Sequence, residues 1–178
     1  MKSLMHTLFL LITITYGYSY ASEEDKSFQE QSMLSVLYVQ SSTEFAANNI
    51  QTFNNASKAL DMALQDKTWT AALEQKNNFS SKKPAIIVDV DETVLDNTPF
   101  NARSIMNHTN YPEGWDVWIY EEKATLIPGV KDFLLRAQKK GVKIFYVTNR
   151  RTMYEQATKN NIKTLGLPFD DDIDVLLP

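Results

Sequence analysis

Two aspartates that follow an apolar run are the residues of this chain best suited to chemistry. Residues 85–88 are apolar and mostly β-branched, which predicts a strand buried on both faces, and Asp89 and Asp91 come at its end. A buried strand does not tolerate carboxylates along its length, so the acids are expected at its carboxyl end. Ligands bind at that edge in open α/β sheets. The aspartates, followed by Thr93, therefore predict reaction chemistry at the mouth of a sheet.

A second apolar run, residues 142–147, also ends abruptly in polar residues, of which Thr148 is the first. Residues 128–141 lie between the two runs and carry Pro-Gly at the start, an apolar helical face and a closing glycine. A strand, a crossover helix and a strand predict two parallel neighbours with a right-handed connection. Asp89, Asp91 and Thr148 are therefore expected at the same edge of the sheet.

Two carboxylates and a hydroxyl at one edge suit phosphoryl transfer. One aspartate can attack phosphorus and form an acyl phosphate, while the other protonates the leaving alcohol and later activates water. A divalent cation would screen the carboxylates from the phosphate, and Mg²⁺ prefers carboxylate and carbonyl oxygens. The threonine and backbone N–H groups would hold the phosphoryl oxygens.

The other elements follow from period and turn residues. Residues 28–67 have helical spacing and predict either two helices with a break near 41–44 or one kinked helix. Residues 97–127 carry turn residues and scattered aromatics without one period, which indicates an insertion. A further helix is expected over 152–165, and 173–177 could begin another strand. The fold class is therefore α/β, with a parallel sheet.

Length and charge limit the class of protein. A chain of 178 residues with 43% hydrophobic content is long enough for one domain with a core. The net charge of −4 and the absence of a basic stripe argue against a nucleic-acid partner.

The first residues resemble a targeting segment. One lysine, a short apolar run and small residues at 19–21 predict a cleaved signal peptide over 1–21, followed by a helical leader over 22–84. An uncleaved N-terminal anchor is the alternative. The sequence has no cysteine, so neither disulfides nor a lipid-bearing cysteine is expected. We therefore expect a secreted or periplasmic protein without a stable membrane anchor, and the sequence leaves its oligomeric state open.

Several motifs together resemble bacterial class C acid phosphatases, which belong to the haloacid dehalogenase-like (HAD) hydrolases and include outer-membrane lipoprotein 5'-nucleotidases. The motifs are D-x-D-x-T at 89–93, F-Y-V-T-N-R at 145–150, V-Q-S with E-F at 39–45, W-D-x-W at 115–118, and Pro-Gly at 128–129. The resemblance implies a HAD-like Rossmannoid parallel sheet with helices on both faces, a helical leader and a small cap insertion, in a core that begins at residue 85.

The resemblance also implies a role for each matching residue. Asp89 becomes the nucleophile and a Mg²⁺ ligand. Asp91 becomes the general acid and base, and supplies its backbone carbonyl to the metal. Thr148 matches the hydroxyl that binds phosphate, and Asn149 and Arg150 would flank the substrate.

Aromatic residues would receive the leaving group. Trp115, or alternatively Trp118, resembles the aromatic that stacks on a nucleoside or aryl group, and Phe45 would form a second wall. Packing of the insertion onto the core is the competing interpretation for both tryptophans.

The implied function is an exported, Mg²⁺-dependent acid phosphatase that hydrolyses nucleoside 5'-monophosphates or aryl phosphates through an aspartyl-phosphate. A non-catalytic phosphate-binding, nucleotide-binding or storage protein on the same fold is the alternative, and a phosphotransferase would use the same residues. The family continues past Leu177 with a lysine and a strand that ends in paired aspartates. We therefore expect the chain to be a partial core, 85–178, and expect 170–172 to be a loop instead of a metal site.

Overall fold

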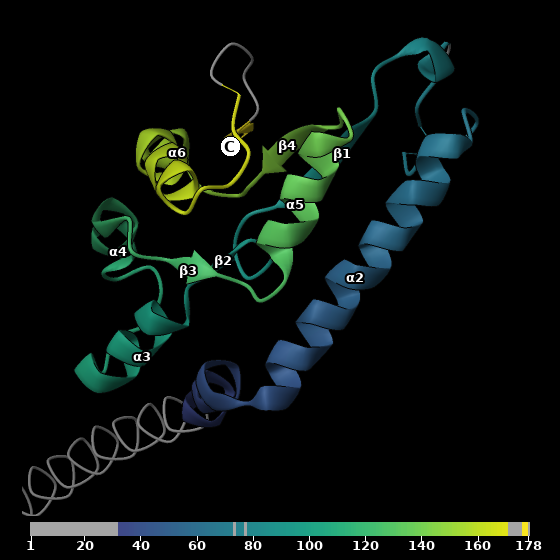
Figure 1. Ribbon diagram of the computed structural model, residues 1–178. Coiled ribbons are helices and arrows are strands. Elements are labelled where there is room, and N and C mark those ends of the chain that lie inside the picture. The colour runs from purple at the N-terminus through teal and green to yellow at the C-terminus, as the bar shows by residue number, and fades with distance from the viewer. Residues whose placement is uncertain (1–31, 73, 77, 171–175, 178) are drawn as a thin grey trace, which may run out of the picture.

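The computed structural model of the protein describes residues 32–72, 74–76, 78–170 and 176–177 (Figure 1). The predicted signal peptide, 1–21, lies outside these residues, as do the start of the helical leader and residues 171–172 of the acidic run. Within the described ranges, no helix combines the length and apolarity that crossing a bilayer would need.

The described chain alternates short strands with helices. Residues 32–41 are helical. The elements that follow are α2 (Thr43–Gln65), η1 (Phe79–Ser81), β1 (Ala85–Asp89), β2 (Leu95–Asp96), α3 (Thr98–Asn107), α4 (Trp115–Glu121), β3 (Thr125–Leu126), α5 (Val130–Lys139), β4 (Lys143–Val147), η2 (Thr152–Tyr154), α6 (Glu155–Thr164) and β5 (Leu176–Leu177).

A parallel sheet with the order β1-β4-β5 forms the centre of the described fold. β1 and β4 pair along five residues, from Ala85 opposite Lys143 to Asp89 opposite Val147. Helix α5 connects them, as the Pro-Gly start and the apolar period predicted. The α/β class with a parallel sheet is confirmed, and both strands end at the same edge.

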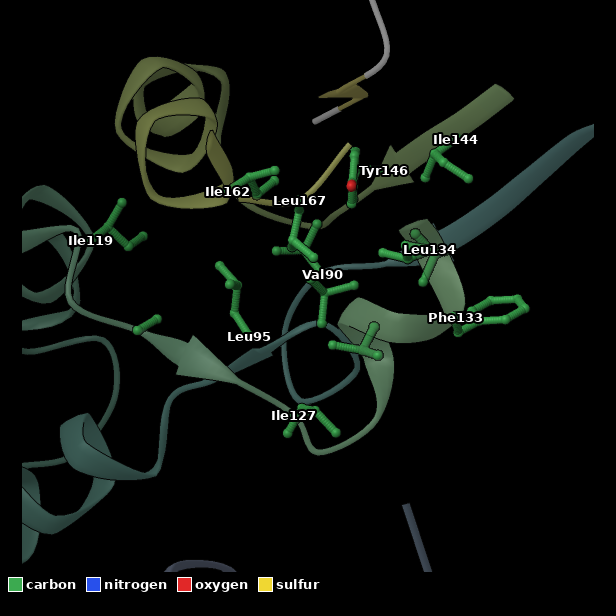
Figure 2. Packing of buried hydrophobic residues seen from close by; sticks show 14 of the residues in the cluster. Val90, Leu95, Ile119, Ile127, Phe133, Leu134, Ile144, Tyr146, Ile162 and Leu167 are labelled. Carbon is green, nitrogen blue, oxygen red and sulfur yellow. The ribbon is translucent and has the colours of Figure 1, made fainter. Parts of the chain in front are cut away.

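The sheet is packed on one face and exposed on the other. Val88 of β1 and its partner Tyr146 of β4 are buried, with exposed fractions of 8% and 0%. Figure 2 shows Tyr146, Leu134 of α5 and Val90 in one apolar cluster. Ile87, which points to the opposite face, is 72% exposed. The prediction that this strand is buried on both faces is therefore wrong for the described residues, because the apolar cluster includes Val88 and leaves Ile87 in water.

The long helix α2 runs along α5 and forms a further layer outside it (Figure 1). Ser42 separates α2 from helix 32–41 and caps it, because its hydroxyl accepts a hydrogen bond from the Phe45 N–H at 3.2 Å. The rings of Phe53 and Phe133 join α2 to α5, with centroids 5.8 Å apart. Of the two arrangements that the sequence left open, the structure has two helices.

Ion pairs also join α2 to α5. Asp61 of α2 pairs with Lys140, which follows α5, at 3.0 Å and with Arg136 of α5 at 2.5 Å. These two cations, Lys140 first, lower the pKa of the Asp61 carboxyl below its ordinary value.

Helices α3 and α4 form an insertion after β1. The two-residue strands β2 and β3 pair antiparallel at its base, with Leu95 opposite Leu126. α4 contacts α6, so the insertion is held against the core near the end of β4.

Candidate active site

Tight backbone geometry places the residues after β1. Val94 and Leu95 both donate their N–H groups to the Val90 carbonyl, at 2.9 and 2.8 Å, and Glu92 adopts the left-handed conformation with φ 57°. Val90 and Val94 are fully buried and anchor this turn in the core. The chain therefore makes a tight turn directly after β1, which places Asp89 and Asp91 at the edge of the sheet.

Asp89 is an exposed carboxylate of the site. It is the last residue of β1, and its Oδ2 accepts a hydrogen bond from the Thr93 hydroxyl at 2.9 Å. Exposure at the end of a strand leaves this side chain accessible to a ligand. Thr93 therefore orients the predicted nucleophile, a part that the sequence pattern did not assign to it.

Asp91 and Thr148 are brought together, as the parallel topology predicted. The Thr148 hydroxyl donates to Asp91 Oδ2 at 3.3 Å, from the position directly after β4. Thr148 is buried, and its Oγ also accepts the Arg150 N–H at 3.1 Å.

Arg150 lies behind Asp91 and not at the surface. Its Nη2 donates to Asp91 Oδ1 at 2.7 Å, and its Nε lies 3.1 and 3.2 Å from the two carboxylate oxygens. The side chain of Arg150 is 3% exposed, so almost none of it is open to solvent. The role that the sequence gave it beside the substrate stays a prediction. Asn149 is exposed at the same strand end.

Asn97 is a site residue that sequence reasoning did not assign. It is 2% exposed, its Nδ2 donates to Asp91 Oδ1 at 2.8 Å, and its Oδ1 accepts the Trp118 indole N–H at 2.9 Å. The signal in the sequence was an asparagine directly before the Thr-Pro start of a helix, a position that more often serves as a cap. Here the side chain makes no capping bond.

The candidate stacking residues have different surroundings. Trp118 is 3% exposed and points its N–H at Asn97, so it has no free ring face for a ligand. Trp115 is half-buried, and its ring lies 5.4 Å from the Arg150 guanidinium carbon. Phe45 lies on α2 with its ring 5.9 Å from that of Tyr38. Of the two tryptophans, Trp115 is the one that a ligand could reach.

Glu92 adds a third carboxyl group to the turn. Its Oε1 accepts the Asn97 N–H at 3.3 Å. Partial removal of this carboxyl from water raises its pKa above the ordinary value; the hydrogen bonds from Asn97 oppose the rise, and the charge of Asp91 adds to it.

The described residues supply only part of a metal site. Asp89 offers a carboxylate and Asp91 a backbone carbonyl, both of which are oxygen donors that suit Mg²⁺. Among the described ranges, however, no group of three or more His, Cys, Asp or Glu side chains is arranged to hold a metal ion. These donors fit Mg²⁺ in kind but are fewer than its octahedral shell needs.

Comparison with known proteins agrees with this geometry. A family model described as HAD superfamily, subfamily IIIB (acid phosphatase) matches residues 19–177. The chain is also similar to the class C acid phosphatase from Bacillus anthracis, in a crystal structure with tungstate bound and in a second structure. Each has 36% sequence identity and a TM-score of 0.72, and the match covers 84% of this chain.

The chain spans 57% and 58% of the length of those two structures. A strand end with paired aspartates, a threonine from the neighbouring strand and an insertion between them agree with the HAD-like class of proteins. Within that class, the chain belongs to the HAD superfamily subfamily IIIB, the acid phosphatases.

Proposed function

We propose that the protein which carries this chain hydrolyses phosphomonoesters through an aspartyl-phosphate on Asp89. The observation that carries the proposal is the meeting of an exposed Asp89 with Asp91 and Thr148 at one edge of the sheet. Family membership supports the reaction class, and tungstate, bound by a related enzyme, is an oxyanion with the tetrahedral shape of phosphate.

In the proposed first step, an Asp89 oxygen attacks phosphorus, the bond from phosphorus to the ester oxygen breaks, and Asp91 gives that oxygen a proton. In the second step, Asp91 takes a proton from water, the water oxygen attacks phosphorus, and the bond to Asp89 breaks. Phosphate leaves, and both aspartates return to their starting state. Thr148 would hold a phosphoryl oxygen through its hydroxyl.

Asp89 and the Asp91 carbonyl would hold Mg²⁺, together with ligands beyond the described residues. When bound, the cation supplies positive charge that screens the carboxylates from the phosphate.

The leaving group and the location are proposed from weaker support. Trp115 is half-buried, and its ring lies over the guanidinium of Arg150, which in turn contacts Asp91; an aromatic side chain this near Asp91 favours an aromatic leaving group such as a nucleoside or an aryl alcohol. The N-terminal apolar run and small residues support export to the periplasm or the medium. Phe45 would be a second wall for the leaving group.

The test compares the protein at its full natural length with Asp89→Asn. With Mg²⁺ present, Asp89→Asn should lower kcat on p-nitrophenyl phosphate and on a nucleoside 5'-monophosphate by more than about a thousandfold, because the amide cannot attack phosphorus. Asp116→Asn, at an exposed position in α4, is the control and should keep wild-type rates. Equal rates in wild type and Asp89→Asn would refute the proposed nucleophile.

A non-catalytic phosphate-binding role is the second candidate for the 178-residue chain taken alone, because it spans little more than half the length of the enzymes it resembles. Isothermal titration of this chain with Mg²⁺ and phosphate, beside an activity assay, separates the two functions. Binding with no hydrolysis would favour the second.

A further inference from the structure

Each nitrogen of the Arg150 guanidinium group donates a hydrogen bond inside the protein. Its Nε and Nη2 face the Asp91 carboxylate, and its Nη1 donates to the Thr158 hydroxyl at 3.1 Å. Thr158 is fully buried in α6 and itself donates to the Tyr154 carbonyl at 2.9 Å. The ring of Trp115 lies over the guanidinium. The group is therefore held by α6 and covered by the insertion.

A buried arginine is costly unless a partner repays its desolvation, and removal of either partner leaves an uncompensated charge. The planar guanidinium grips a carboxylate through two parallel hydrogen bonds, which fixes the direction of the carboxylate as well as its distance. Asp91 keeps 24% of its side chain exposed, whereas Arg150 keeps 3%. The accessible partner is thus the one that the proposed reaction uses.

Asn97 holds the same carboxylate from a second direction. It donates to Asp91 Oδ1 and accepts from Trp118 of α4 and, at 3.3 Å, from Arg150 Nη2. Asp91 is therefore fixed by contacts that begin in α6 and in the insertion, two elements that also contact each other.

We propose that Arg150 is a positioning residue which aims the Asp91 carboxylate at the leaving-group oxygen and does not itself bind the substrate. This inference rests on the proposed function. The two roles can be told apart by experiment. Loss of a positioning arginine should impair proton transfer to the leaving group, whereas loss of a substrate-binding arginine should weaken the affinity for the substrate.

The experiment measures Arg150→Met in the protein at its full natural length, with two substrates. An alkyl phosphate needs a proton on its leaving oxygen, whereas p-nitrophenolate leaves without one. Hydrolysis of the aspartyl-phosphate, in which Asp91 acts as the base, is common to both substrates, so the comparison uses kcat/KM, which reports formation of the aspartyl-phosphate. Because a misplaced general acid forfeits roughly a hundredfold or more in rate, kcat/KM on the alkyl ester should fall about a hundredfold. On p-nitrophenyl phosphate kcat/KM should fall much less, and the inhibition constant of inorganic phosphate should stay within about twofold of wild type.

Two further variants are measured in the same kinetic experiment. Arg150→Lys should show the same loss as Arg150→Met, because an ammonium group cannot make the two parallel hydrogen bonds that the guanidinium makes to the Asp91 carboxylate. Arg151→Met, at the exposed neighbouring position, should match wild type. Equal losses of kcat/KM on both substrates would overturn the proposal. A weaker inhibition by inorganic phosphate would then indicate substrate binding, and unchanged inhibition would indicate a merely structural role.

A third variant guards against misfolding. Thr158→Val keeps the shape of the buried side chain and removes the hydroxyl that holds Arg150 Nη1. It should show the same preference for p-nitrophenyl phosphate over the alkyl ester, with a smaller loss.

A measurement of stability, which does not depend on enzyme activity, separates this proposal from the proposed function. Urea unfolding midpoints of wild type, Arg150→Met, Asp91→Asn and the double variant form a cycle. Arg150→Met should lower the midpoint clearly in wild type and much less in the Asp91→Asn background. Equal losses in both backgrounds would show that Arg150 does not hold Asp91. If wild type hydrolyses neither substrate, the proposed function fails, and the cycle alone decides whether Arg150 fixes this carboxylate.

Discussion

Tyr146 is a buried titratable residue at the centre of the core. Its side chain is fully buried in β4, and its hydroxyl donates to the Pro168 carbonyl at 2.7 Å. Burial raises the pKa of the Tyr146 hydroxyl far above its ordinary value. The folded protein therefore keeps this proton at pH values where the unfolded chain loses it.

This raised pKa predicts a pH dependence of stability. Below about pH 10 both states keep the proton, and as the pH rises further the unfolded state alone releases it, so stability falls. Tyr146→Phe should cost about 1 kcal/mol in urea unfolding at about pH 8, through the lost hydrogen bond, and that difference should shrink by about pH 10.5. Tyr111→Phe, at a 70% exposed position, should show no such trend. A Tyr146→Phe difference that is constant with pH would contradict the account.

Single residues of the site were predictable where the chain direction fixes them. Asp89 ends β1, Asp91 lies two residues further on, and Thr148 follows β4; parallel pairing brings these strand ends together whatever the side chains do. The contacts of Asp91 with Arg150 and Asn97 were not predictable. Whether Arg150 points outward or back at Asp91 depends on its rotamer and on the space that α6 leaves. Asn97 meets Trp118 only after the insertion has folded.

At the scale of elements, helices α2 and α5 meet at a glycine. Gly129 is the N-cap residue directly before α5 and has φ +88°. A Cβ atom there would lie 3.0 Å from the Ile50 Cα of α2 and 3.4 Å from the Phe53 Cβ. The backbones of the two elements therefore approach closely only because residue 129 has no side chain.

Gly129→Ala tests this approach against a matched control. Gly141 also has a positive φ, +75°, but a Cβ atom there would meet nothing within 4 Å. Gly141→Ala should cost about 1–2 kcal/mol of unfolding free energy from the backbone alone. Gly129→Ala should cost a further 1–3 kcal/mol, roughly, because α2 must shift away from α5. Equal losses for the two variants in urea unfolding would show that α2 does not pack as described.

Elements with a sustained period were predictable, and the short ones were not. The sequence indicated α5, β4 and α6 because an apolar period and glycine stops mark them. The paired strands β2 and β3 have two residues each, too few for a period to show. Helices α3 and α4 lie in a segment with mixed turn residues and aromatics, and tertiary contacts such as Trp118 with Asn97 decide their form.

At the scale of the whole molecule, the described helices cover one face of the sheet and leave the other open. Ile87 is 72% exposed and Val147 is 38% exposed on the open face. The apolar run at 85–88 predicted burial on both faces. However, β-branched residues are common both in strands buried on one face and in strands buried on two, and composition alone does not show which elements pack against a strand. β1 is also an edge strand of the described sheet.

The exposed face predicts unequal effects of the same kind of substitution at neighbouring positions of β1. In the 178-residue chain, Ile87→Thr should change the unfolding free energy by less than about 0.5 kcal/mol, because its side chain is already in water. Val88→Thr, at a position that is 8% exposed, should cost about 1–3 kcal/mol, because it buries a hydroxyl without a partner. Urea unfolding at two protein concentrations measures both variants. A large loss for Ile87→Thr that grows with protein concentration would show that a second copy covers this face, and a large loss independent of concentration would show that the chain itself does.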